Sequence, residues 1–97
     1  MPEKWQQLRP LVAGCGSIGK RHARVLKSLG VEKVLACDPV AEARDALAAD
    51  VPEAQLFDNY ESALDAAPDA VVICTPPKMH VPMALQAIHA GCDVLTE

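Results

Sequence analysis

Three glycines at fixed spacing carry the first chemical signal of this sequence. Gly14, Gly16 and Gly19 follow the apolar run of residues 11–13 and open a segment with helical periodicity. In such a turn the first glycine permits a tight reversal, the second lets the backbone approach a phosphate, and the third lets helix and strand pack closely. The helix N-terminus binds an anion without a basic side chain. The motif predicts a pyrophosphate site formed by Gly14, Cys15, Gly16, Ser17, Ile18 and Gly19.

An acidic residue stands where the ribose of a dinucleotide needs one. Asp38 follows the apolar run of residues 34–37, close to the roughly 20-residue spacing that is typical of a ribose-binding acid. Its carboxylate would accept hydrogen bonds from the ribose hydroxyls and would repel a 2′-phosphate. Pro39 supplies no cation to offset that repulsion. The sequence therefore favours NAD over NADP as the cofactor.

A second polar loop follows another apolar run. Residues 70–74 are continuously apolar, as expected of a parallel strand buried on both faces, and they lead into a loop with two prolines. The prolines stiffen this loop, and we expect Thr75 and Pro76 to border the nicotinamide end of the cofactor. His80 has two interpretations that stay open: a group directed at cofactor or substrate, or a residue at the start of a helix with a local role.

Apolar runs of strand length alternate with segments of helical period, which predicts a doubly wound α/β fold with a parallel sheet. The expected strands cover residues 11–13, 34–37, 55–57, 70–74 and 93–96. Right-handed crossovers would order them 3-2-1-4-5. Ligands bind at the carboxyl ends of the first and fourth strands in such a sheet. The glycine turn, Asp38, residues 75–80 and Glu97 all fall at that edge.

The spacing of apolar residues predicts which helix faces pack on the sheet. The expected buried face of the first helix, which ends at Gly30, consists of Ile18, His22, Val25, Leu26 and Leu29. A second helix is expected at residues 41–49. Asp58 is the expected cap of a third helix, with Glu61 completing a capping box. The expected buried face of the fourth helix consists of Val81, Ala84, Leu85 and Ile88.

Length and composition limit the function classes. The 97 residues form one dinucleotide-binding domain, with residues 1–8 as an N-terminal arm. No stretch is long enough to span a membrane and the N-terminus lacks an apolar signal segment, so we expect a cytoplasmic protein. Four widely spaced cysteines without a CxxC motif argue against a metal site. A net charge of −4 with a single Trp, Tyr and Phe disfavours nucleic-acid binding.

Four stretches together resemble one known family. They are GCGSIGKRHA from residue 14, CDP from residue 37, DAVVICTPPKMH from residue 69 and AGCDVLTE from residue 90. From about residue 11 to residue 97 the chain is similar to the N-terminal half of the glucose-fructose oxidoreductase and inositol dehydrogenase family, Gfo/Idh/MocA. The TPxxxH pattern and the strand ending in Glu are the more specific parts. Lys78 departs from the family pattern, in which Asn is common at this position.

The resemblance implies a parent protein that transfers hydride between a nicotinamide cofactor and a sugar, polyol or related carbonyl compound. In that family the final Glu, here Glu97, opens a Glu-Lys-Pro motif whose Lys assists catalysis. A C-terminal α/β domain carries further substrate and catalytic groups. Both would follow Glu97, so we expect this chain to bind the cofactor without turnover, with His80 as its one catalytic candidate. A sheet edge without that domain also predicts self-association.

Two other function classes stay open. A stand-alone nucleotide-binding or redox-sensing module needs only the glycine turn and Asp38, and it would bind the cofactor without catalysis even with a C-terminal half supplied. An S-adenosylmethionine-dependent transferase also uses a glycine-rich turn and an acid after the second strand. The third glycine, Gly19, and the loop of residues 75–80 make the transferase the weaker alternative. Competition between the two cofactors distinguishes these classes.

Overall fold

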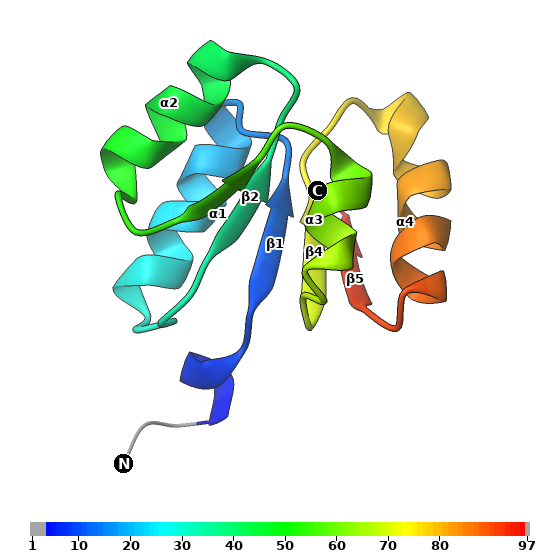
Figure 1. Ribbon diagram of the computed structural model, residues 1–97, viewed down its shortest axis with the longest axis horizontal. Helices are drawn as coiled ribbons and strands as arrows, with labels where there is room; N and C mark the ends of the chain where they lie inside the picture. The colour runs from blue at the N-terminus through cyan, green and yellow to red at the C-terminus, as the bar shows by residue number, and fades with distance from the viewer. Residues whose placement is uncertain (1–3, 97) are drawn as a thin grey trace.

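The computed structural model describes residues 4–96 and contains a five-stranded parallel sheet (Figure 1). The strands are β1 (Pro10–Ala13), β2 (Leu35–Cys37), β3 (Gln55–Phe57), β4 (Ala70–Ile73) and β5 (Asp93–Thr96). They pair in the order β3-β2-β1-β4-β5, which confirms the predicted order. β1 pairs in parallel with both β2 and β4. The point where the strand order reverses therefore lies between β1 and β4.

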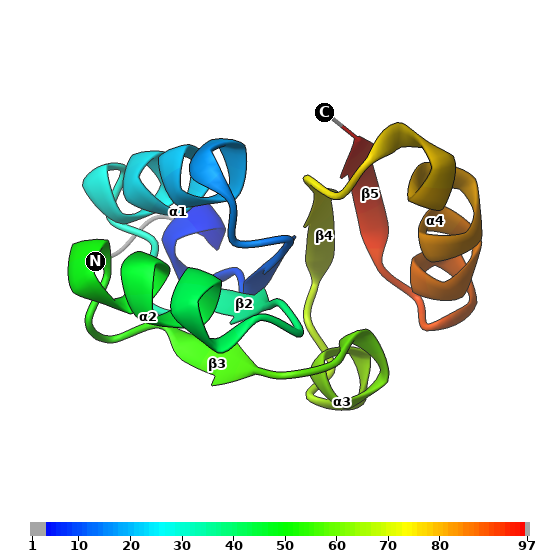
Figure 2. The same ribbon diagram turned by 90° about the horizontal axis from the view of Figure 1, so that it is seen from above.

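The helices divide between the two faces of the sheet (Figure 2). α1 (Ser17–Ser28) and α2 (Ala41–Asp50) cover one face, and α3 (Tyr60–Asp65) and α4 (His80–His89) cover the other. Two short 3-10 helices, η1 (Lys4–Gln7) and η2 (Pro77–Met79), precede β1 and α4. Right-handed crossovers place the helices in this way, because the chain moves outward in opposite directions from β1 and from β4. Among residues 4–96, no helix has the length and apolar character needed to cross a membrane.

Each face of the sheet has its own hydrophobic core. Leu11, Val71 and Ile73 are buried toward α3 and α4, whereas Val12 and Ala36 are buried toward α1 and α2. All four residues of β1 are buried. This continuous burial agrees with the unbroken apolar runs that the sequence shows for a strand covered on both faces.

The predicted buried face of α1 is wrong. The buried residues of this helix are Gly19 and Ala23, while the exposed fractions of Ile18, Val25 and Leu29 are 48%, 48% and 53%. The expected face also included His22 and Leu26, which are half-buried. A helix approaches a sheet most closely through its smallest residues. The close approach through Gly19 and Ala23 turns the larger side chains away from the core.

The predicted buried face of α4 is also wrong. Met83 and Ala87 are the buried residues of this helix. Val81, Leu85 and Ile88 are exposed, and Ala84 is half-buried. The predicted cap of α3 is displaced by one residue, because the side chain of Asn59, not Asp58, accepts a hydrogen bond from Ser62 N at 2.8 Å.

The N-terminal segment is tied to the turn after α1. Residues 4–7 form η1, and Glu32 N donates to Gln6 O at 3.0 Å. Gly30, which follows α1 with a φ of 91°, lies against the side chain of Gln6. Part of the predicted N-terminal arm is therefore packed on the domain.

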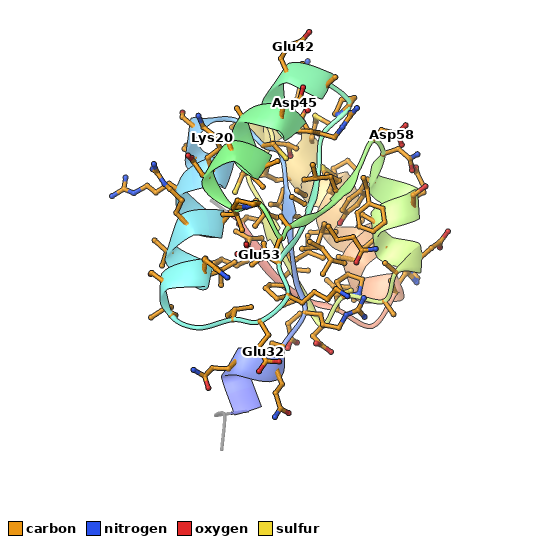
Figure 3. All side chains as sticks on the ribbon, turned by 60° about the vertical axis from the view of Figure 1, so that its left-hand side comes forward. Lys20, Glu32, Glu42, Asp45, Glu53 and Asp58 are labelled. Carbon is orange, nitrogen blue, oxygen red and sulfur yellow. The ribbon has the colours of Figure 1, made fainter. Side chains whose placement is uncertain are left out.

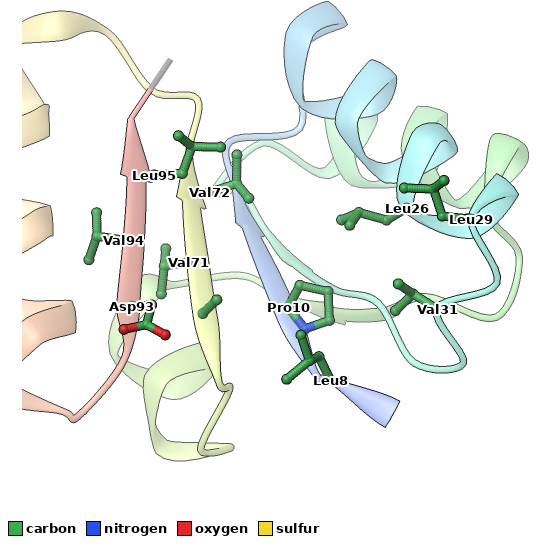
Figure 4. A pocket seen from close by; sticks show the side chains of 11 residues that line it. Leu8, Pro10, Leu26, Leu29, Val31, Val71, Val72, Asp93, Val94 and Leu95 are labelled. Carbon is green, nitrogen blue, oxygen red and sulfur yellow. The ribbon is translucent and has the colours of Figure 1, made fainter. Parts of the chain in front are cut away.

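An apolar groove runs along the sheet beside α1 (Figure 4). Its volume is about 460 Å³, and Asp93 is its one charged lining residue. Leu26 of α1 and Leu29, which directly follows this helix, line one side, and Val72 of β4 and Leu95 of β5 line the other. The groove exists because α1 and α2 cover only the β1, β2 and β3 part of this face (Figure 2). It lies away from the glycine turn and lacks the polar groups of a nucleotide site.

We expect the chain to self-associate through this groove at high concentration. Leu29 and Leu95 are more than half exposed, and an apolar patch of this kind favours a contact that excludes water. The double variant Leu29→Glu, Leu95→Glu should be a monomer with near wild-type stability, because neither side chain is in the core. Sedimentation velocity over a concentration series measures both proteins. A wild-type chain that stays monomeric throughout the series would contradict the expectation.

Candidate functional site

The glycine turn joins β1 to α1 and is shaped by two of its glycines. Gly14 has a φ of 102°, a conformation that other residues rarely adopt. A Cβ at Gly14 would also lie only 3.1 Å from the carbonyl of Cys74, and a Cβ at Gly19 would overlap the carbonyl oxygen of Gly14. Gly14 therefore permits the turn, and Gly19 lets α1 pack against the end of β1.

The second glycine of the turn, Gly16, faces open space. Gly16 is the N-cap of α1, no side chain caps this helix, and no atom lies within 4 Å of the place a Cβ would take. The first N–H groups of a helix have no partner within the helix, and its N-terminus attracts anions. Ser17 and Ile18 are exposed on the same first turn. The turn therefore presents backbone donors to an open surface.

Asp38 joins the glycine turn to the turn after β2. Its Oδ2 accepts a hydrogen bond from Cys15 N at 2.8 Å, and its Oδ1 accepts one from Val40 N at 2.9 Å. Gly14 N donates to Cys37 O at 2.9 Å, which holds the ends of β1 and β2 together. The carboxylate is therefore fixed beside the glycine turn, where the sequence predicts the ribose.

The thiols beside the turn are buried and stay protonated. Cys15 is 1% exposed, and its Sγ donates to Cys37 O at 3.5 Å. Burial raises the pKa of Cys15 to about 11, and the negative charge of Asp38 adds to the rise. Burial likewise raises the pKa of Cys37 to about 12. Because the thiolate is the reactive form of cysteine, these two thiols are unreactive near neutral pH.

We expect the free energy of unfolding to fall as the pH rises above about 9. In the unfolded chain the thiols ionise near 9.0, whereas the folded-state pKa values of Cys15 and Cys37 are about 11 and about 12. Their contribution to stability is complete below the unfolded pKa and is lost as the pH rises toward the folded values. A difference of one pKa unit between the folded and unfolded states corresponds to about 1.4 kcal/mol in the free energy of unfolding. Urea unfolding at about pH 8 and about pH 10 measures the loss.

The variant Cys15→Ala is the control for this pH dependence. It removes the raised pKa of one buried thiol, so the loss of stability between the two pH values should be smaller than in the wild type. An equal loss in both proteins would show that Cys15 does not contribute.

The loop after β4 is braced by two side chains. His80 Nε2 lies 2.6 Å from the carbonyl oxygen of Thr75, and Thr75 Oγ1 donates to the Sδ of Met83 at 3.2 Å. Since a carbonyl oxygen only accepts hydrogen bonds, Nε2 is the donor in the first contact. The local role of His80 that the sequence left open is therefore present. A role toward cofactor or substrate stays a prediction.

A pocket of about 240 Å³ lies among the loops at the carboxyl ends of the strands. It brings together three of the predicted site residues: Gly14, Asp38 and Thr75. The other predicted residues within residues 4–96 do not line this pocket. Gly16, Ser17 and Ile18 lie at the exposed start of α1, and Cys15 and Gly19 are buried behind the turn. Pro76 and His80 lie farther along the loop after β4. Glu97 is outside the described residues.

Seven residues of this pocket were not predicted as site residues. They are Cys37, Pro39, Asp58, Asn59, Tyr60, Met79 and Met83. The signal for Asp58, Asn59 and Tyr60 was available, because they follow β3 and the carboxyl ends of parallel strands meet at one edge. Tyr60 Oη donates to Met83 O at 2.8 Å and so links α3 to α4. Burial raises the pKa of Tyr60 to about 12, which keeps this donor protonated.

Comparison with known proteins identifies the family of this chain. The sequence model of the Gfo/Idh/MocA oxidoreductase family, described as an NAD-binding Rossmann fold, matches residues 8–97. The chain belongs to this family. Inositol 2-dehydrogenase of Corynebacterium glutamicum is 35% identical over 95 residues, covering 95% of this chain and 28% of the relative. D-glucoside 3-dehydrogenase of Escherichia coli is 33% identical over 93 residues, covering 93% of this chain and 26% of the relative.

Solved structures of family members share the fold. Myo-inositol 2-dehydrogenase from Lactobacillus plantarum superposes with a TM-score of 0.82 at 30% identity, covering 93% of this chain and 27% of that structure. GenD2 from gentamicin A biosynthesis, solved in complex with NAD, gives a TM-score of 0.82 at 31% identity, covering 93% of this chain and 26% of that structure. The chain spans little more than a quarter of the length of the curated relatives it matches. Within residues 4–96, no group of three His, Cys, Asp or Glu side chains is placed to hold a metal ion.

Proposed function

We propose that this chain binds NAD(H) at the β1–α1 turn. One observation carries the proposal: the Asp38 carboxylate accepts a hydrogen bond from Cys15 N in the glycine turn, next to a helix N-terminus that faces open space at Gly16. The acceptor proposed for the ribose hydroxyls and the backbone donors proposed for the pyrophosphate therefore lie next to each other. Asp38 disfavours a 2′-phosphate, so the proposed cofactor is NAD(H) in preference to NADP(H).

The residues around the turn fit the parts of a dinucleotide. First-turn N–H groups of α1 would hold the pyrophosphate, and Gly16 leaves room for it. Asp38 would accept hydrogen bonds from the ribose hydroxyls. The pocket of about 240 Å³ that Asp38 and Thr75 both line would take a part of the dinucleotide beside the ribose. The braced loop that begins at Thr75 would border the nicotinamide.

We further propose that the chain is the cofactor domain of a dehydrogenase that acts on a sugar, polyol or related carbonyl compound. Support for this substrate class comes from the relatives named inositol 2-dehydrogenase and D-glucoside 3-dehydrogenase. The bound nicotinamide supplies the hydride donor or acceptor. The residues of this chain bind and orient it. Groups that act on the substrate belong to further parts of a longer polypeptide, so the chain alone binds the cofactor without turnover.

Nuclear magnetic resonance tests the location of the site. On addition of NADH to the labelled chain, we expect amide shifts to change at Cys15, Gly16, Asp38 and Thr75, because these residues surround the proposed ligand. The amides of α1's far end, including Leu29, are the internal control and should not move. Shift changes confined to the apolar groove would contradict the proposal.

A further inference from the structure

An arginine of α2 is anchored at the backbone of the residue proposed to face the ribose. Arg44 Nη1 donates to the carbonyl oxygen of Asp38 at 2.7 Å. The carboxylate of the same Asp38 is fixed by Cys15 N and Val40 N. The Arg44 guanidinium is therefore held at the main-chain carbonyl of Asp38, and the Asp38 carboxylate is held by two backbone N–H groups. A positive and a negative group are thus both tied to Asp38, the residue proposed to face the ribose.

Both charges act on the glycine turn. Asp38 adds to the rise in the pKa of Cys15, and Arg44 opposes that rise. Within residues 4–96, the ion pairs that link α1 to the α2 region use other cations, Arg24 with Asp50 at 3.8 Å and Lys27 with Glu53. The bond to Asp38 O uses one of the five N–H donors of the guanidinium. Donors of Arg44 are therefore left for a ligand.

We propose that Arg44 is a specificity-determining residue of the nucleotide site, because its guanidinium partly offsets the repulsion between Asp38 and a ribose 2′-phosphate. The inference rests on the proposed NAD(H) site. Guanidinium groups pair with phosphates in a fixed, often bidentate geometry. The chain therefore binds NADPH more weakly than NADH without excluding it. The preference depends on the single charge of Asp38, and removing that charge leaves a cation in place to receive the 2′-phosphate.

Two further acids on α2 act against Arg44, and their effect is smaller than that of Asp38. Glu42 and Asp45 are exposed, and Glu42 projects away from the protein (Figure 3). Exposed charges are screened by salt and water, whereas partly buried charges are screened less. Asp38 and Arg44 are both half-buried. The balance of positive and negative charge at the proposed ribose position is therefore set chiefly by Asp38 and Arg44.

Two small ligands that differ only in the 2′-phosphate provide the probe. The affinities of 5′-AMP and adenosine 2′,5′-bisphosphate are measured by calorimetry at fixed salt for the wild type, Arg44→Gln, Asp38→Asn and the double variant. Asp38→Asn removes the charge and keeps an acceptor oxygen for the turn. Arg44→Lys keeps the cation, and Lys33→Gln removes an exposed cation before β2, at the opposite edge of the sheet. The ratio of the two affinities cancels any general effect on the fold.

We expect Arg44→Gln to shift the affinity ratio about fivefold further against the 2′-phosphate, as loss of a charge-assisted contact requires. Asp38→Asn should shift it about tenfold or more in favour, and the double variant should lose most of that gain. Arg44→Lys keeps the charge without the fork geometry, so its ratio should lie between those of the wild type and Arg44→Gln. Lys33→Gln should leave the ratio near the wild-type value. If Asp38→Asn and the double variant give equal affinity ratios and both still bind 5′-AMP, the proposed role of Arg44 is wrong and the nucleotide site stands. If the folded wild type binds neither 5′-AMP nor adenosine 2′,5′-bisphosphate, the proposed nucleotide site itself is wrong.

Discussion

Gly19→Ala should destabilise the protein more than any other single substitution in the glycine turn. The new methyl group would overlap the carbonyl oxygen of Gly14, which is backbone and is held by the turn. Relief requires α1 to move away from β1, and overpacking of this kind costs about 3 kcal/mol or more. For a domain of this size that is a large part of a total stability of roughly 5–15 kcal/mol. Urea unfolding measures the change in the free energy of unfolding.

Gly16→Ala is the matched control, since it adds the same methyl group three residues earlier. No atom lies within 4 Å of the new Cβ, and the φ of Gly16 is −71°, which suits any residue. The free energy of unfolding should therefore change by less than about 0.5 kcal/mol. NADH affinity should fall about tenfold or more, because the methyl group occupies the space proposed for the pyrophosphate. If Gly19→Ala and Gly16→Ala have similar free energies of unfolding, the packing of α1 against β1 does not require a glycine at position 19.

Asp38→Ala should lower NADH affinity by about two orders of magnitude or more. The carboxylate is proposed to accept two hydrogen bonds from the ribose, and bonds to a charged group contribute roughly 1.5–3 kcal/mol each. The substitution also leaves Cys15 N and Val40 N without their acceptor. Calorimetric titration of a folded variant, with folding checked by circular dichroism, measures the loss.

Asp65→Ala controls for the loss of one negative charge. Asp65 is exposed at the end of α3 and does not line the pocket. Its removal should change NADH affinity less than twofold. If Asp38→Ala and Asp65→Ala bind NADH equally well, the ribose is not held at Asp38 and the proposed orientation of the cofactor is wrong.

The sheet and the glycine turn could be predicted because they depend on local, strongly constrained signals. Continuous apolar runs such as residues 70–74 leave few alternatives to a buried parallel strand, and right-handed crossovers then fix the strand order. Gly14 and Gly19 have structural roles that no other residue can fill. Asp38 could be placed at the turn because the end of β2 lies beside the end of β1.

The helix faces could not be read from apolar spacing alone. The prediction favoured side chains such as Ile18 and Leu85, whereas α1 packs through the small residues Gly19 and Ala23 and α4 packs through Met83 and Ala87. How close a helix comes to a sheet is a property of the assembled layers, and it decides which residues are buried. The contribution of Met83 to the pocket depends on the same packing, since it comes from α4 and not from a strand end.

Calorimetric titration of the wild-type chain with NADH tests the central claim most directly. The account predicts saturable binding at one site, no comparable heat with S-adenosylmethionine, and weaker binding of NADPH. Circular dichroism of the same sample establishes that the chain is folded. Absence of NADH binding by the folded chain, or binding of S-adenosylmethionine in its place, would contradict the assignment of the glycine turn and Asp38 as an NAD(H) site.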